Sequence, residues 1–173
     1  MTTQAIHDRA MGFSRIAGFP KEQGCIDCTH IALQAPLEDS EMFRNRKGFH
    51  SINVQLMCDN MHRIMSDDAR YPGSTHDAFI LCDSVISAMF QQQPERQSWL
   101  LGVKGYRLAT WLMMPLRVAR TEADHEYMSH IATCSIIERT IGILKQHFRC
   151  WTILEATCNT PLRLPVSCLL HAA

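Results

Sequence analysis

The order of hydrophobic patterns along this 173-residue chain constrains its fold more than any single motif does. Residues 49–59 alternate apolar and polar positions, which predicts a strand with one buried face. Residues 24–34 are rich in β-branched and apolar residues and stop at Pro36, which predicts another strand. Asp59-Asn60 is a turn signal, so a third strand is expected at 62–70, paired back as a hairpin.

Helical and strand patterns then alternate. Residues 77–90 have apolar positions at helical spacing, with Ser74 or Thr75 as the expected cap. Residues 99–103 form a short apolar run that predicts a buried strand. Residues 121–148 predict a long helical region, with room for a break, whose buried face carries Ile136, Ile137, Ile141, Leu144 and Phe148. The order of strands, helix, strand and helix predicts a mixed α/β domain.

The charge balance argues against a dedicated nucleic-acid-binding domain. Seventeen basic residues offset seventeen acidic ones, whereas such domains usually carry an excess of basic residues. A local patch is still available, because residues 44–50 contain Arg44, Arg46 and Lys47 and no acid. The alternative interpretation of this segment, a solvated loop, is equally compatible with the pattern.

The eight cysteines are expected to be free thiols. No apolar run approaches the roughly 18 residues of a membrane span, and the first residues lack a secretory signal, so a reducing compartment is expected. Cys25 and Cys28 form a C-x-x-C spacing, but a structural zinc site needs a second pair of ligands. Cys58 and His62 fill that role poorly, since Cys58 falls in a strand pattern. Small buried side chains are the favoured interpretation, with a zinc-stabilised interaction module as the alternative.

Three separated acids have a joint meaning that none has alone. Asp27 lies within a predicted strand, where acids are depleted. Asp77 lies at a predicted helix N-terminus, where an acid commonly stabilises the helix, and Glu138 could lie on an exposed helix face. Together they offer hard oxygen ligands from three elements, which suits Mg²⁺ or Mn²⁺ and metal-assisted phosphoryl transfer.

Several ordered stretches resemble one known family. They cover residues from about Phe13 to Cys150 and are similar to the harbinger transposase-derived nucleases, the DDE transposase relatives of PIF/Harbinger elements. The matching stretches are Gly24-Cys-Ile-Asp-Cys-Thr-His-Ile-Ala32, Asn45-Arg-Lys-Gly-Phe-His-Ser-Ile-Asn-Val-Gln55, Tyr71-Pro-Gly-Ser-Thr-His-Asp-Ala-Phe-Ile-Leu81, Trp99-Leu-Leu-Gly102, Gly105-Tyr106, Leu112-Met-Met-Pro115 and Ile137-Glu-Arg-Thr-Ile-Gly-Ile-Leu-Lys-Gln-His-Phe-Arg-Cys150.

The resemblance implies an RNase H-like mixed sheet flanked by helices, with a divalent-metal site. Asp27, Asp77 and Glu138 would be the metal ligands, with Asp27 and Glu138 as the catalytic pair. The family has Gly-Asp-Ser-Gly-Tyr where this chain has Gly-Val-Lys-Gly-Tyr, so Val103 stands at the position of a fourth ligand. The implied organisation is a leader at 1–12, the nuclease domain at 13–150 and a shortened, divergent tail at 151–173.

The expected function is a metal-dependent DNA endonuclease that hydrolyses phosphodiester bonds. The alternative is a catalytically inactive DNA- or protein-binding remnant, because Val103 replaces an expected aspartate. DNA binding is expected to be weak and sequence-nonspecific, through Arg44, Arg46 and Lys47, so a DNA-binding partner protein would supply specificity. The resemblance implies a nuclear location, with the cytoplasm as a second one.

Overall fold

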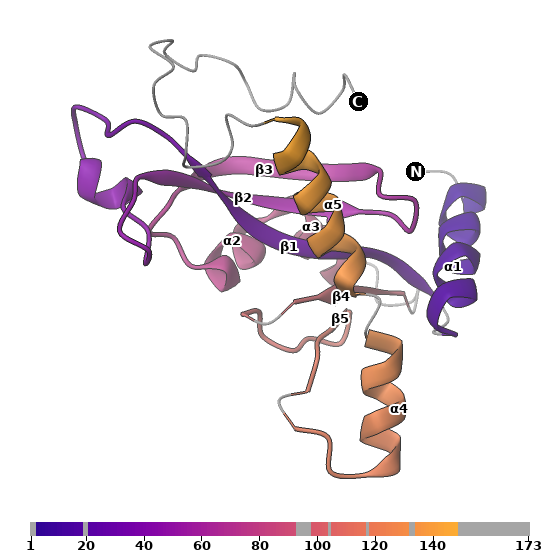
Figure 1. Ribbon diagram of the computed structural model, residues 1–173. Helices are drawn as coiled ribbons and strands as arrows, with labels where there is room; N and C mark the ends of the chain where they lie inside the picture. The colour runs from indigo at the N-terminus through magenta and orange to yellow at the C-terminus, as the bar shows by residue number, and fades with distance from the viewer. Residues whose placement is uncertain are drawn as a thin grey trace.

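A five-stranded mixed sheet forms the centre of the protein, with strand order β3-β2-β1-β4-β5 (Figure 1). The computed structural model describes residues 3–18, 21–92, 98–103, 105–116, 118–131 and 134–148. The strands are β1 (Glu22–Ala32), β2 (Ser51–Cys58), β3 (Ile64–Pro72), β4 (Trp99–Gly102) and β5 (Leu112–Met113). The α/β class predicted from the order of patterns is confirmed.

The strands change direction in the middle of the sheet. β1 pairs with β2 antiparallel, from Cys25 opposite Cys58 to Ala32 opposite Ser51. β2 and β3 continue as an antiparallel hairpin. β4 lies parallel to β1 on its other side, with Ile26 beside Gly102, and β5 lies parallel to β4. The central strand β1 therefore has an antiparallel and a parallel neighbour.

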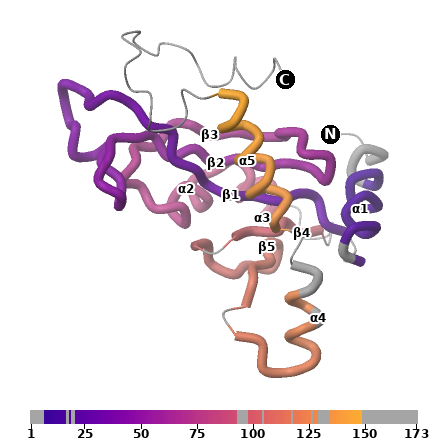
Figure 2. The backbone as a smooth tube through the Cα atoms, in the orientation of Figure 1, coloured from indigo at the N-terminus to yellow at the C-terminus, as the bar shows by residue number. Residues whose placement is uncertain are grey.

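Helices cover both faces of the sheet. The α-helices are α1 (Thr3–Ala17), α2 (Asp77–Asp83), α3 (Val85–Gln91), α4 (Glu122–Ile131) and α5 (Ser135–His147). A short 3-10 helix, η1 (Ser40–Phe43), lies between β1 and β2. In Figure 1, α5 crosses the near face over β1 and β2, while α2 and α3 lie behind the sheet. Figure 2 shows α4 projecting away from the sheet.

Successive residues of β1 point into two different cores, as the period of a strand requires. Cys25 and Ile31 belong to a cluster that includes Phe13 of α1 and the apolar residues of α5. Ile26 belongs to a second cluster, with residues of α2, α3 and the region around Trp111. Odd-numbered positions of β1 therefore face α5, and even-numbered positions face α2 and α3.

The helical pattern predicted at 77–90 is two helices rather than one. Ser84 ends α2 and begins α3, because its hydroxyl donates to the Leu81 carbonyl at 2.7 Å and accepts from Ser87 N at 3.2 Å. The predicted caps of α2 were wrong as well: His76 is the N-cap, and its ring Nδ1 accepts from Ala78 N at 3.1 Å.

The pattern at 121–148 contains the break for which the prediction left room. α4 begins after Thr121, whose hydroxyl accepts from Asp124 N at 3.1 Å, and α5 follows from Ser135. Four of the five residues expected on its inner face are buried, and Phe148 is partly buried. Helix α1 and strand β5 were not predicted from the sequence, and the tail at 151–173 lies outside the described residues.

The five described cysteines are free thiols. Cys25 points into the core under α5, whereas Cys28, three positions along the same strand, lies on the other face with its Sγ 3.2 Å from the Tyr106 hydroxyl. Two ligands on opposite faces of a strand cannot share an ion, so the zinc alternative built on Cys25 and Cys28 was wrong. Within the described part of the chain, no helix has the length and apolar character to cross a bilayer.

Candidate functional site

Asp27 occupies the middle of the central strand on the face covered by α5. It is an odd-numbered position of β1, opposite Leu56 of β2, which belongs to the core beneath α5. One carboxylate oxygen, Oδ1, accepts a hydrogen bond from Cys28 N at 2.7 Å. Glu138 is an exposed residue of the first turn of α5, the helix that packs on β1 and β2.

The pKa of Asp27 depends on its burial and on several nearby charges. Burial raises the pKa of Asp27 to about 7; the hydrogen bond from Cys28 N opposes this rise, and the negative charges of Asp77 and Glu138 add to it. Lys145 lowers it. The negative charges of the other two predicted acids therefore both act on Asp27, as expected for a carboxylate that has like charges near it.

Asp77 approaches from the N-terminus of α2 and is held by a buried amide. Asn53 Nδ2 donates to Asp77 Oδ1 at 2.8 Å and to the Thr75 carbonyl at 3.0 Å. A Cβ built on Gly105 would lie 3.5 Å from Asp77 Oδ2, and Gly105 has a φ of +129°. The conformation favours glycine there, and the segment after β4 therefore runs directly beside Asp77.

Val103 fills the position where a fourth carboxylate was expected. The parallel register pairs Ile26 with Gly102, so one further step along both strands brings Val103 beside Asp27. The Val103 side chain packs against both hydrophobic clusters. An apolar side chain therefore continues the core up to the acidic residues.

A cationic turn precedes strand β2. Gly48 N donates to the Asn45 carbonyl at 2.9 Å, and the Asn45 side chain donates to Ser51 Oγ at 2.9 Å and accepts from Lys47 N at 2.9 Å. Asn45 is buried, while Arg46 and Lys47 at the tip are exposed. The chain therefore presents two cations on a turn of fixed geometry.

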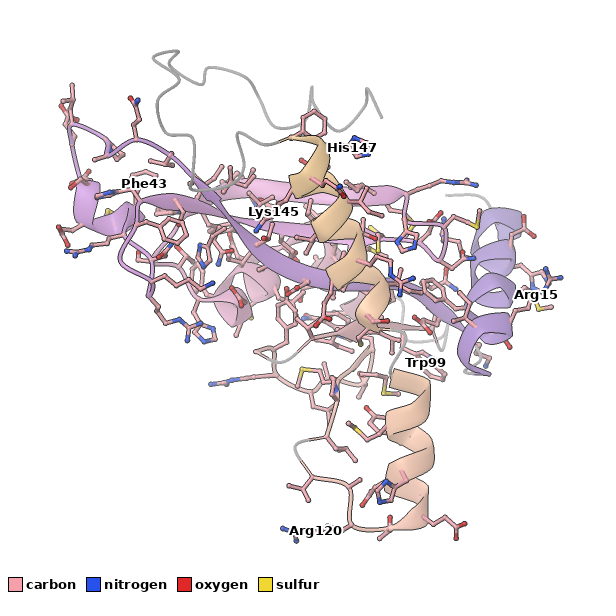
Figure 3. All side chains as sticks on the ribbon, in the orientation of Figure 1. Arg15, Phe43, Trp99, Arg120, Lys145 and His147 are labelled. Carbon is pink, nitrogen blue, oxygen red and sulfur yellow. The ribbon has the colours of Figure 1, made fainter. Side chains whose placement is uncertain are left out.

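Lys145 links this turn to Asp27. Burial lowers the pKa of Lys145, the positive charge of Lys47 lowers it further, and Asp27 raises it. Figure 3 shows Lys145 on α5, over the sheet. Desolvation lowers the pKa of His30 as well, with Asp77 opposing and Lys145, Lys47 and Arg46 contributing. The pKa of His30 is therefore affected both by the acidic Asp77 and by these three cations.

Arg44 differs from its two neighbours. Its guanidinium lies 3.9 Å from Glu41 in an exposed ion pair. Such a pair contributes little to stability, but it partly neutralises the charge that a phosphate would meet. Lys104, which follows Val103, lies outside the described residues.

The donor set has the right chemistry but not a preformed cage. Carboxylate oxygens from three elements are the ligands that Mg²⁺ and Mn²⁺ favour. Among the described residues, however, no group of three or more His, Cys, Asp or Glu side chains is gathered closely enough to hold an ion as it stands. Of the three acids, Glu138 is exposed, whereas Asp27 and Asp77 are partly buried.

Sequence patterns missed two residues that organise this site. Asn53 is a fully buried amide inside a strand, a position where asparagine is depleted. Its identity was a usable signal, because a buried amide needs a partner. Gly105 gave no such signal, since its close approach to Asp77 depends on how two distant segments meet.

The fold is an α/β domain built on a mixed sheet, with acids on the central strand and on the last helix. The sequence matches the family described as "DDE superfamily endonuclease" over residues 26–171. The chain therefore belongs to the DDE superfamily endonuclease family, and its sheet has the RNase H-like arrangement predicted for it.

The most similar relatives include HARBI1 proteins, which are named as candidate nucleases. The Bos taurus protein is 39% identical over 150 residues, covering 86% of this chain and 42% of the relative. The Homo sapiens protein is 40% identical over 148 residues, covering 85% of this chain and 42% of the relative. A protein of Arabidopsis thaliana named ALP1-like is 24% identical over 182 residues, with 92% and 44% covered.

The chain thus spans less than half the length of these curated relatives. No solved structure matches it.

Proposed function

We propose that this chain is a divalent-metal-dependent DNA endonuclease domain derived from a Harbinger transposase. Family membership supports the class, because endonucleases of this superfamily generally depend on divalent metal ions. The observation that supports the proposal is that α5, the helix that carries Glu138, packs on β1, the strand that carries Asp27, and that the negative charges of Asp77 and Glu138 both act on Asp27.

Asp27 and Glu138 would hold Mg²⁺ or Mn²⁺, with Asp77 as an accessory ligand oriented by Asn53. A bound divalent ion supplies Lewis acidity, which lowers the pKa of an attacking water and stabilises the leaving oxygen of a phosphodiester. The protein's part is to keep Asp27 desolvated and fixed by the Cys28 amide. Glu138 then completes the ligand set from α5.

DNA would reach this site along a short cationic path. Arg46 and Lys47 on the turn, together with Lys145 on α5, are suited to phosphate contacts, since their charges already act on His30 beside the acids. Arg44 would add a weaker contact because Glu41 shares its charge. Phosphate contacts carry no base readout, so we expect weak, sequence-nonspecific binding and a partner protein that selects the DNA. A nuclear location, with the cytoplasm as a second one, fits such a substrate.

Val103 favours a second candidate, a DNA- or protein-binding domain that has lost catalysis. Its side chain belongs to the hydrophobic clusters rather than to a metal site. Loss of one ligand weakens the binding of at least one metal ion, and two-metal-ion catalysis needs both ions. The two candidates share the DNA surface and differ in what the acids do.

Titration calorimetry of Mn²⁺ into the purified domain, followed by a plasmid-nicking assay, separates them. The matched variants are Val103→Asp, which restores a carboxylate, and Val103→Asn, which has the same shape without the charge. We expect the wild type to bind Mn²⁺ weakly and to nick the plasmid slowly. Val103→Asp should bind Mn²⁺ more tightly and nick faster, whereas Val103→Asn should not.

Two results would change the conclusion. Mn²⁺ binding that is unaffected by Asp27→Asn and Glu138→Gln would remove the metal site from these residues. Absence of nicking in both the wild type and Val103→Asp, with DNA binding retained, would favour the non-catalytic candidate.

A further inference from the structure

The turn between β2 and β3 is fixed by its own hydrogen bonds. Asp59 Oδ1 accepts from Met61 N at 2.8 Å and from Arg63 N at 2.9 Å, and His62 N donates to the Asp59 carbonyl at 3.2 Å. His62 adopts a left-handed conformation, with a φ of 64°. From this turn the His62 side chain extends toward α5, where its ring contacts Thr140.

The His62 ring makes a hydrogen bond to a buried hydroxyl on α5. His62 Nδ1 lies 2.8 Å from Thr140 Oγ1. The Thr140 hydroxyl has a single proton, and its closest acceptor is the Ile136 carbonyl at 2.7 Å. Thr140 Oγ1 therefore accepts from His62, so Nδ1 carries a hydrogen in this arrangement.

The same turn is anchored on its other side by α1. A Cβ added at Gly12 of α1 would collide with the side-chain amide of Asn60. Figure 1 shows α1 standing at the end of the sheet where this turn lies. The turn therefore lies between the first helix and the last one and contacts both.

We propose that His62 is a positioning residue for Glu138, a role that rests on the proposed metal-dependent function. Glu138 lies between Ile136 and Thr140, the two residues that the Thr140 hydroxyl joins. The apolar face of α5 holds the helix against the sheet by contacts that are not directional. The hydrogen bond from His62 is directional, and it sets the rotation of the turn of α5 that carries the carboxylate.

Two substitutions at one position test this proposal. Both His62→Asn and His62→Gly tolerate the left-handed backbone, since asparagine and glycine populate it more readily than other residues do. Only asparagine retains an N–H donor near the place of Nδ1. Loss of a residue that orients a metal ligand typically weakens metal affinity by about 10–100-fold. We therefore expect His62→Gly to bind Mn²⁺ about 10-fold more weakly in titration calorimetry, and His62→Asn to bind nearly as the wild type does.

A second readout needs no metal. Amide hydrogen exchange of α5 should be about 10-fold faster in His62→Gly than in the wild type over the turn around Glu138, and near wild-type in His62→Asn. Thr140→Val removes the acceptor and should reproduce the His62→Gly result, while Thr140→Ser retains it. Urea unfolding of each variant confirms that the folded domain is the species measured.

The outcomes separate the two proposals. If the wild type binds no Mn²⁺ but exchange follows this pattern, the proposed function fails and the positioning of α5 by His62 stands. If the wild type binds Mn²⁺ and His62→Gly matches it in affinity and in exchange, the role of His62 is overturned. Equal losses in His62→Asn and His62→Gly would also overturn it, because the hydrogen bond would not be the cause.

Discussion

The two turns at the ends of strand β2 are built alike but are used differently. Before β2, the turn from Asn45 to Gly48 is held by the buried Asn45 side chain. After β2, the turn at 59–63 is held by the buried Asp59 side chain. The first turn exposes Arg46 and Lys47, whereas the second places Asn60 against α1 and His62 against α5.

This difference separates contact with a ligand from support of the fold. Exposed cations at one end of β2 can be changed without opening the core. At the other end, side chains are shared between helices, so a change there reaches the stability of the domain and the placement of Glu138. Substitutions at the two ends of β2 should therefore differ most in their effect on stability.

The largest effect on stability is expected at Glu22, whose carboxyl group is fully buried. Its charge acts on Cys58, the last residue of β2, where the turn at 59–63 begins. Burial raises the pKa of Glu22 to about 8 from 4.5, against the hydrogen bond with Cys25. A raised pKa means that the folded protein binds the proton more tightly. The stability from this group is thus complete below about pH 4.5, falls as pH rises and is lost above about pH 8.

Urea unfolding across this range should show a pH-dependent loss on the order of 3–5 kcal/mol from Glu22. Glu22→Gln should remove that part of the slope and should be more stable than the wild type at pH 9. Asp27, whose pKa is also raised, contributes in the same direction and leaves a smaller slope in the variant. Equal slopes in the variant and the wild type would contradict the burial of an ionisable Glu22.

Asp59→Ala is the next largest change. It leaves two backbone N–H groups of the turn without their acceptor, and each unsatisfied group costs about 1–3 kcal/mol where water cannot reach it. We expect a loss of about 2–3 kcal/mol in urea unfolding. Asp59→Asn is the matched control, because its side-chain oxygen can still accept, and it should lose clearly less. Similar losses in both variants would mean that these hydrogen bonds do not set the stability of the turn.

Much of the fold could be predicted because its elements carry local signals. The alternation at 49–59 and the turn signal at Asp59-Asn60 were sufficient to predict the β2–β3 hairpin. The failures were elements whose formation depends on distant contacts. Strand β5 has two residues and is defined by pairing with β4. Ser84 broke a continuous helical pattern because its hydroxyl satisfied backbone groups of both flanking helices.

The candidate site was predictable as a set of residue types but not as a geometry. Motif resemblance named Asp27, Asp77 and Glu138, and the effect of Asp77 and Glu138 on Asp27 required the structure. Lys145 acts on Asp27 only because α5 crosses β1. His62 and Thr140 are 78 positions apart, so no local pattern could have joined them.

Asn45→Ala should have an intermediate effect on stability, because the Asn45 side chain both holds its turn together and fixes the backbone that presents Arg46 and Lys47. It removes the donor to Ser51 Oγ and the acceptor of Lys47 N, which should cost about 1–2 kcal/mol. It should also weaken DNA binding, since Arg46 and Lys47 would no longer be presented on a fixed turn. Asn45→Asp retains the acceptor and not the donor, so it should keep the turn conformation better than alanine. Unchanged DNA affinity in Asn45→Ala would show that the shape of the turn does not matter for binding.

The smallest change in stability is expected for Arg46→Ala combined with Lys47→Ala. Both side chains are exposed, and substitutions at such positions usually stay within about 0.5 kcal/mol. DNA affinity should nevertheless fall, and by the same factor for every sequence, because phosphate contacts are blind to the bases. Each lost contact should reduce the salt slope by about 0.9. Fluorescence anisotropy with two unrelated duplexes at several salt concentrations measures both quantities, and His62→Gly is the opposite control, with lower stability and an unchanged salt slope. Tight binding of one duplex that survives the double substitution would mean that the DNA surface lies elsewhere. The turn before β2 would then have no role in DNA binding, and the contrast between the two ends of β2 would be wrong.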